Sequence, residues 1–203
     1  MNKRVSLVAF TIAVTVVFIA PITFLYLLTK PIVALNEEVF LKRAVLSAAG
    51  LAAPASNTEA KALFDSRVEV LPPGAAGPST EPVYRVKDGS GATAGWVITR
   101  TGPGLWGDIT AVVGFAADRE RLAGLEFLKQ SETPGLGARI GERWFKQQFR
   151  GKRGPFSTVG EGEPATENEF DAITGATFTS NAVRALVNAV VADAAKLPKE
   201  GTE

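Results

Sequence analysis

The chain of 203 residues contains neither cysteine nor histidine. Without cysteine it cannot hold an iron–sulfur cluster through thiolates, form a disulfide or use a thiol nucleophile. Without histidine it lacks the usual haem ligand and the usual base of a catalytic triad, and the common zinc ligands are missing too. Chemistry must come from carboxylates, hydroxyls, backbone groups or an organic cofactor. We expect no metal site and no catalytic residue of its own.

A large excess of charge of one sign is also missing. The chain has 22 lysines and arginines against 21 acidic residues, which gives a formal net charge of +1. No basic surface for nucleic acid is indicated, so we expect no nucleic-acid partner. A local acidic run predicts a solvated loop, or else a docking surface for a cationic partner; it comprises Glu161, Glu163, Glu167 and Glu169.

What the chain does have is a long apolar run, Val5 to Thr29, without a charged residue. As a helix at about 1.5 Å per residue it is longer than a hydrocarbon core of roughly 30 Å. A cleavable signal peptide normally has a shorter apolar region and a small-x-small cleavage site, which does not follow cleanly here. We predict an uncleaved single-pass anchor over residues 1–30. The basic residues Lys3 and Arg4 precede this run, which predicts that the N-terminus is cytoplasmic and that the chain after the anchor is exported.

After the anchor we expect a helical connector over residues 31–80 and a domain over residues 81–203. A helix should continue to about residue 51, and Ser56 and Glu59 have the spacing of a capping box for a second helix. The stretch "LPPGAAGPSTEP", residues 71–82, should break regular structure.

Strand patterns then follow one another with short turns between them, at residues 83–87, 95–100, 108–116 and 122–130. Such connections predict antiparallel pairing. A short helix over 142–149, a loop with an edge strand over 150–170 and a closing helix over 178–196 complete the pattern. We predict an α+β fold: a transmembrane helix, then one two-layer domain with a mainly antiparallel sheet and flanking helices on one side.

The segment before the closing helix, "DAITGATFTSNAV", gathers hydroxyl groups around a Gly-Ala pair. They belong to Thr174, Thr177, Thr179 and Ser180. Hydroxyls at this place commonly cap a helix. Small residues beside free N–H groups at a helix start also suit a phosphate, so both interpretations stay open here.

Two glycine-rich loops lie where predicted strands end, "TGPGLWGD" at residues 101–108 and "SETPGLGARI" at residues 131–140. Glycine and proline are common in turns, so both loops can be simple turns. In that case Trp106 covers the core and Glu132 is a surface charge. Alternatively, the bare backbone of each loop approaches a flat ligand, with Trp106 or Leu136 packed against its ring.

Three motifs together resemble a known family: "GLWG" at Gly104–Gly107, "ETPGLG" at Glu132–Gly137 and "DAITGAT" at Asp171–Thr177. The family comprises the RnfG-like subunits of the Rnf electron transport complex and the NqrC-like subunits of the Na+-translocating NADH:quinone reductase, and the resemblance covers nearly the whole chain. It implies one covalent FMN per chain, joined through its phosphate to Thr177 by a separate flavin transferase after export.

The resemblance also implies the surroundings of the flavin. Gly175 and Ala176 would give the transferase access to Thr177, while Asp171 and Thr174 belong to the signature that it reads. The expected neighbours of the ring are Leu105, Trp106, Glu132, Thr133, Gly135, Leu136 and Gly137. One departure is Gln130, which stands where many family members have histidine.

The implied function is that of a membrane-anchored electron-transfer subunit, which turns over no substrate alone. It would work in an ion-translocating oxidoreductase of the bacterial plasma membrane, with membrane, iron–sulfur and flavin subunits as partners and the FMN domain outside. The short chain and "DAITGATFTSNAV" favour the Rnf type, whereas "GLWG" favours the quinone reductase. A stand-alone exported flavoprotein reductase and a noncovalent module for a phosphorylated ligand are the remaining alternatives.

Overall fold

The computed structural model describes residues 2–72, 74, 81–163 and 165–197. The chain divides into two compact units, Met1–Phe40 and Leu41–Glu203. Much of the predicted break over residues 71–82 lies outside the described residues. We describe each unit by itself.

The first unit is helical and belongs to α1, Lys3–Ala48, which is long and apolar enough to cross a membrane. The hydroxyls of Thr11, Thr15 and Thr29 each donate a hydrogen bond of 2.8–2.9 Å to the carbonyl four residues earlier. These bonds satisfy the polar side chains within the helix, as a hydrocarbon environment requires. The predicted helix is confirmed and runs without a break through Pro21 and Pro31.

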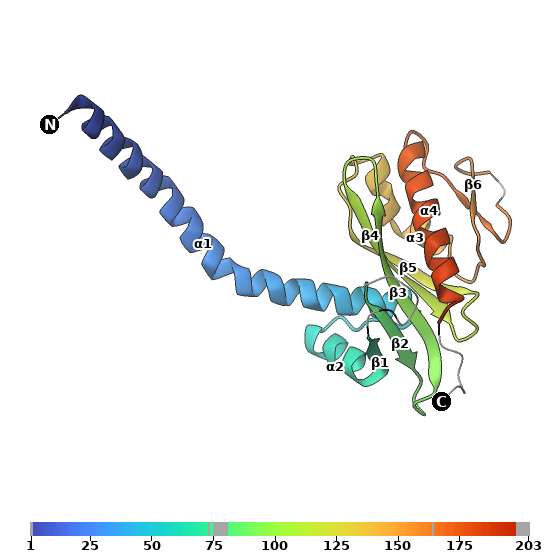
Figure 1. The fold of residues 1–203 in the computed structure, drawn as a ribbon. Helices are drawn as coiled ribbons and strands as arrows, with labels where there is room; N and C mark the ends of the chain where they lie inside the picture. Colours follow the sequence, from blue (N-terminus) through green and yellow to red (C-terminus); the bar gives the residue numbers. More distant parts are fainter. Residues whose placement is uncertain (1, 73, 75–80, 164, 198–203) are drawn as a thin grey trace. The chain divides into compact units, whose positions relative to one another are not determined.

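The second unit is built on a five-stranded antiparallel sheet in the order β1-β2-β3-β4-β5 (Figure 1). The strands are β1 Val68–Leu71, β2 Val83–Lys87, β3 Thr93–Pro103, β4 Asp108–Ala116 and β5 Leu122–Lys129. The four predicted strands and their antiparallel pairing are confirmed. The pattern did not predict β1, because Val68–Leu71 directly follows a helix without a turn signal.

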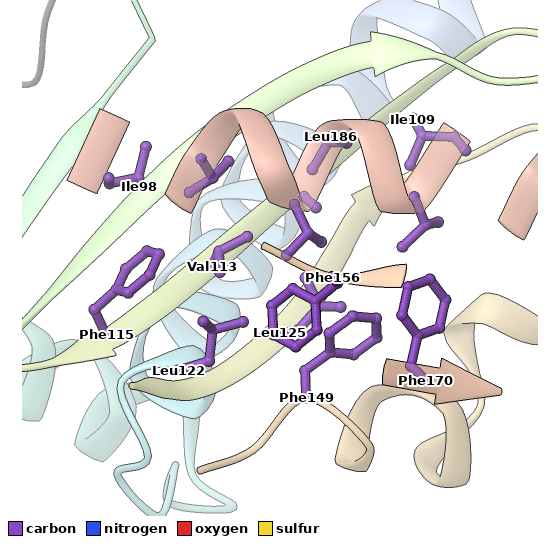
Figure 2. Packing of buried hydrophobic residues seen from close by; sticks show 14 of the residues in the cluster. Ile98, Ile109, Val113, Phe115, Leu122, Leu125, Phe149, Phe156, Phe170 and Leu186 are labelled. Carbon is purple, nitrogen blue, oxygen red and sulfur yellow. The ribbon is translucent and has the colours of Figure 1, made fainter. Parts of the chain in front are cut away.

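One face of the sheet carries the main core. It packs against α4, Thr177–Ala194, and the two are joined by Ile98, Val113 and Leu186 (Figure 2). Phe149, Phe156 and Phe170 close the core beside them. The closing helix predicted from its apolar spacing is thus present and covers β3 and β4.

The opposite face of the sheet is also covered by helices. Val97 and Val112 alternate with the residues of the main core and face a second buried cluster, which contains Leu46 of α1 and Phe64 of α2. The helix α2 spans Asn57–Arg67 and begins with the predicted cap at Ser56. The expectation of helices on one side is therefore corrected, because strands with two apolar faces need cover on both.

Shorter elements complete the second unit. A 3-10 helix η1, Gly137–Gly141, leads to α3, Arg143–Gln147, which is shorter than the predicted helix over 142–149. The predicted edge strand is present as a parallel pair of β6, Ser157–Val159, and β7, Glu169–Asp171. These elements lead the chain to the start of α4.

Candidate functional site

A buried carboxylate, Glu132, connects two of the glycine-containing motifs with the start of α4. Its side chain is only 5% exposed. Oε1 accepts hydrogen bonds from the backbone N–H groups of Leu105 at 2.8 Å and Trp106 at 3.2 Å. Oε2 accepts one from the Thr179 hydroxyl at 2.5 Å. Glu132 therefore holds the β3–β4 loop and the first turn of α4 against its own loop.

Two motif glycines make room for this carboxylate. A Cβ on Gly104 would lie 2.6 Å from Glu132 Oε1, and a Cβ on Gly137 would lie 2.5 Å from Thr179 Oγ1 and 2.9 Å from Glu132 Oε2. Any larger residue at either position would displace the hydrogen-bonded groups. These glycines are thus explained by the packing of the loops around Glu132.

The side chain two positions before Glu132 supports the same loop. Gln130 Oε1 accepts a hydrogen bond of 2.6 Å from the Glu132 N–H group. The carbonyl of Thr133 accepts from Leu136 and Ala138, which folds the loop into a compact turn, and Gly135 has a positive φ of 75°. Thr133 and Gly135 are exposed and face solvent next to the loop's apolar residue.

Large apolar side chains gather in the open around these loops. Trp106 is 69% exposed and Phe178 is 74% exposed. With Leu105 and Leu136 they form an exposed apolar group, named here the apolar patch. Among the described residues of the second unit, Val70 is the one other large hydrophobic with comparable exposure. Exposed large apolar residues of this kind make these loops a candidate binding surface.

The first turn of α4 carries Phe178 of the apolar patch. Thr177 is the first residue of the helix and is exposed, and Ala176 at the N-cap offers no side-chain cap. Among the described residues, no acceptor is hydrogen-bonded to the backbone N–H groups of Thr177, Phe178 and Thr179. The helix start thus has an exposed hydroxyl and three N–H groups without an acceptor among the described residues.

The expected caps take other partners instead. Thr179 donates to Glu132, and the Ser180 hydroxyl donates to the Ala176 carbonyl and accepts from the Ile173 N–H group at 3.0 Å. The capping interpretation of this hydroxyl cluster is therefore wrong for Thr179 and Ser180. Both are buried, whereas Thr177 is exposed.

A second carboxylate, Glu161, fixes the loop before α4. The Thr174 N–H group donates to Glu161 Oε2 at 2.8 Å, and Glu161 pairs with Arg139 through bonds of 2.7 and 3.3 Å. Asp171 Oδ2 accepts from the Gly162 N–H group at 3.0 Å. Asp171 and Thr174 thus order the loop through residues 161–162, and neither is bonded to Thr177.

Charge on Glu161 is stabilised by these partners. The Arg139 guanidinium and the Thr174 N–H group lower the pKa of Glu161 from its ordinary 4.5 to about 2. Arg139 also lies 5.2 Å above the Trp144 ring. Glu161 is therefore part of the ordered site, although the acidic run predicted a solvated loop or a docking surface for a cationic partner.

Gly175 completes the loop. Its φ of 78° lies in the left-handed region, and a Cβ there would lie 3.1 Å from Leu136 Cδ2. The conformation and the close contact both favour glycine. This contact brings the Asp171–Thr177 motif onto the Glu132–Gly137 motif.

The geometry joins three loops, an exposed hydroxyl, free N–H groups and an apolar patch. Residues 104–192 match the family of FMN-binding domains. This match contains all three motifs and every predicted site residue.

Relatives of both predicted kinds are found. In the Na(+)-translocating NADH-quinone reductase of Neisseria meningitidis serogroup A, the subunit designated C is 34% identical over 109 residues, which is 50% of this chain and 42% of that protein. In the ion-translocating oxidoreductase complex of Methanosarcina acetivorans, the subunit designated G is 35% identical over 100 residues, 49% of this chain and 51% of that protein. The chain spans about half the length of these relatives. The resemblance to both kinds of protein is confirmed.

The fold of this chain is shared with a solved structure. The crystal structure of Shewanella oneidensis NqrC superposes with a TM-score of 0.68, at 20% identity, and the match covers 75% of this chain and 91% of that one. The predicted sheet with flanking helices is therefore the fold of a known relative.

The residues present fit an FMN. The free N–H groups of α4 and the exposed Thr177 hydroxyl suit a phosphate, and the apolar patch suits a flat aromatic ring. Sequence reasoning missed Phe178, Glu161 and Arg139. Phe178 had a recognisable signal, a large apolar residue among small polar ones at a helix start. Glu161 and Arg139 had none, since their contacts join distant parts of the chain.

Proposed function

We propose that this chain is a membrane-anchored subunit that carries one covalent FMN on Thr177 and passes electrons within an ion-translocating oxidoreductase complex. The observation that carries the proposal is the position of Thr177, exposed at the first residue of α4 and followed directly by the exposed Phe178 of the apolar patch. Relatives of both complexes and the FMN-binding domain match support it.

The chain's residues divide the work of holding the cofactor. The Thr177 Oγ1 atom would form the ester with the FMN phosphate: in the flavin transferase it would replace the leaving group on the phosphorus of the flavin donor, and the hydroxyl proton would leave with that group. The free N–H groups at the start of α4 donate to the remaining phosphate charge. Leu105, Trp106 and Leu136 exclude water from the ring, and Glu132 keeps their two loops together. When bound, FMN supplies reversible electron transfer.

The absence of histidine and cysteine supports a carrier rather than a stand-alone reductase. A reductase of an exported substrate needs a group that moves protons near neutral pH, and no ordinary one is present. Within the proposal, the anchor places the FMN domain outside the cytoplasm, where a covalent tether prevents loss of the cofactor. Membrane and iron–sulfur or flavin subunits of the complex are the partners.

Attachment is tested by expression with a flavin transferase, followed by a denaturing gel viewed under ultraviolet light. The wild-type band should fluoresce and Thr177→Ala should be dark. Thr177→Ser should retain some label, because it keeps the hydroxyl, and Thr174→Ala should at most reduce it. A fluorescent Thr177→Ala band would place the attachment elsewhere.

The type of complex needs a separate experiment, since the two kinds of relative match about equally well. We favour the Rnf type because the stretch "DAITGATFTSNAV", residues 171–183, resembles that type more closely. Tagged chain should be purified from its own membranes in mild detergent and its companions identified by mass spectrometry. Companion proteins of an Rnf-type complex are expected. Quinone-reductase proteins would assign the other type, and a chain that purifies alone would favour the stand-alone reductase.

A further inference from the structure

A groove with an excess of positive charge lies along the edge strand β5, and the proposed FMN site does not use it. Its volume is about 350 Å³. Ser47 near the end of α1 lines one wall, Gly124 and Glu126 of β5 form the floor, and the segment around α3 supplies Arg143, Lys146 and Arg150. None of these residues belongs to the three motifs.

The charges in the groove do not balance. Its one carboxylate, Glu126, accepts from Lys146 Nζ at 2.5 Å through Oε2 and from the Ser47 hydroxyl at 2.8 Å through Oε1. Within the described part of the chain, neither Arg143 nor Arg150 forms an ion pair. Lys146 is thus neutralised by Glu126, and two guanidinium charges remain without a counter-ion.

One of the three cations is held by a neighbour, because Lys146 is fixed by its bond to Glu126. Arg143 and Arg150 are exposed, so both guanidinium groups can be reached by a ligand from solvent.

We propose that this groove binds a phosphate ester. Two uncompensated guanidinium groups match the charge of a phosphate dianion, and the planar fork of arginine suits its oxygens. The groove is larger than an inorganic phosphate needs, so it has room for the organic part of the ester. A soluble phosphate ester and a phospholipid headgroup share this chemistry.

Charged side chains beside an edge strand also prevent pairing with other strands. That role needs only charge near β5 and predicts no affinity for a phosphate ester. Binding therefore separates the two explanations.

The test uses the full chain in detergent, with glycerol 3-phosphate as the soluble probe in calorimetry and phosphatidylglycerol as the lipid probe in native mass spectrometry. The variant Arg143→Gln/Arg150→Gln removes the two free charges. The variant Lys129→Gln/Arg184→Gln removes the same charge from outside the groove. Loss of a charge-assisted hydrogen bond should weaken binding about tenfold for each arginine.

We expect a probe to bind to the wild type and to the control variant, with about a hundredfold loss in Arg143→Gln/Arg150→Gln. Binding of glycerol 3-phosphate would identify a soluble ester as the ligand, and retention of phosphatidylglycerol alone would identify a lipid. No binding, or equal loss in both variants, would overturn the proposal. If a glutamate-rich peptide bound with the same affinity as the phosphate probes, the groove would be a protein-docking surface and not a phosphate-ester site. Flavin labelling of Thr177 should be unchanged in both variants. Failure of the groove proposal would therefore leave the proposed function intact.

Discussion

At the residue scale, Glu132 has the largest structural role in the site. Its two oxygens satisfy donors from the β3–β4 loop and from α4, and the side chain is buried. A carboxylate in this position stabilises the folded chain because it pairs groups that would otherwise lose their hydrogen bonds.

Replacement of Glu132 by alanine should therefore destabilise the second unit. We expect a loss of about 2–3 kcal/mol in the free energy of unfolding, since several donors lose their acceptor. Urea unfolding of the full chain in detergent, followed by tryptophan emission, measures this loss. Glu167→Ala should change the free energy by less than about 0.5 kcal/mol, because Glu167 is exposed. Equal effects of the two substitutions would contradict the role of Glu132.

Glu161 should titrate far below an ordinary glutamate. Its pKa of about 2 in the folded chain lies below the usual 4.5, so its stabilising contribution is complete above pH 4.5 and is lost as the pH falls through about 2. The Thr174 amide proton reports on this carboxylate, and its NMR shift should move with a midpoint near pH 2. Arg139→Gln should raise that midpoint. A wild-type midpoint near 4.5 would show that Arg139 does not hold Glu161.

At the element scale, the β3–β4 hairpin and the start of α4 present the apolar patch. The hairpin ends in a four-residue loop closed by the Gly104 N–H bond to the Gly107 carbonyl at 2.9 Å. This loop puts Trp106 in solvent instead of in the core. A rigid hairpin tip with an exposed indole is suited to contact with a flat ring.

Trp106→Leu should brighten the emission of attached flavin, because an indole near the ring quenches it. Fluorescence should be normalised to the flavin absorption of protein that stays folded. Trp144→Phe serves as the control, since Trp144 packs on Arg139 and Phe145. Unchanged emission and absorption in Trp106→Leu would place the flavin away from the hairpin.

Local patterns in the sequence predicted most elements of the fold but not the contacts that assemble the site. The strand patterns of β3 and β4 and the apolar spacing in α4 involve residues close together in the sequence. They could therefore be recognised from the sequence alone. The bond from Thr179 to Glu132 spans 47 positions, and that from Arg139 to Glu161 spans 22. Such pairs arise from tertiary packing. The cover on the second face was missed for the same reason, because Leu46 and Phe64 meet the sheet only in the folded chain.

At the scale of the whole molecule, the anchor and the FMN domain should lie on defined sides of the membrane. Lys3 and Arg4 precede an apolar run without charge, which favours a cytoplasmic N-terminus. Alkaline phosphatase fused to the C-terminus should be active, because it folds only after export. The reverse result, an inactive phosphatase and an active cytoplasmic reporter at the same position, would contradict this orientation.

The central claim is that one FMN is attached to Thr177, and peptide mass mapping tests it most directly. Trypsin should release residues 154–184, because no lysine or arginine lies between Arg153 and Arg184. In protein expressed with a flavin transferase, we predict that this peptide carries one FMN, less one water, and that its fragments place the added mass on Thr177. Intact mass should show one FMN per chain. Label on Thr174, Thr179 or Ser180, or an unmodified peptide in protein that binds flavin, would contradict the account.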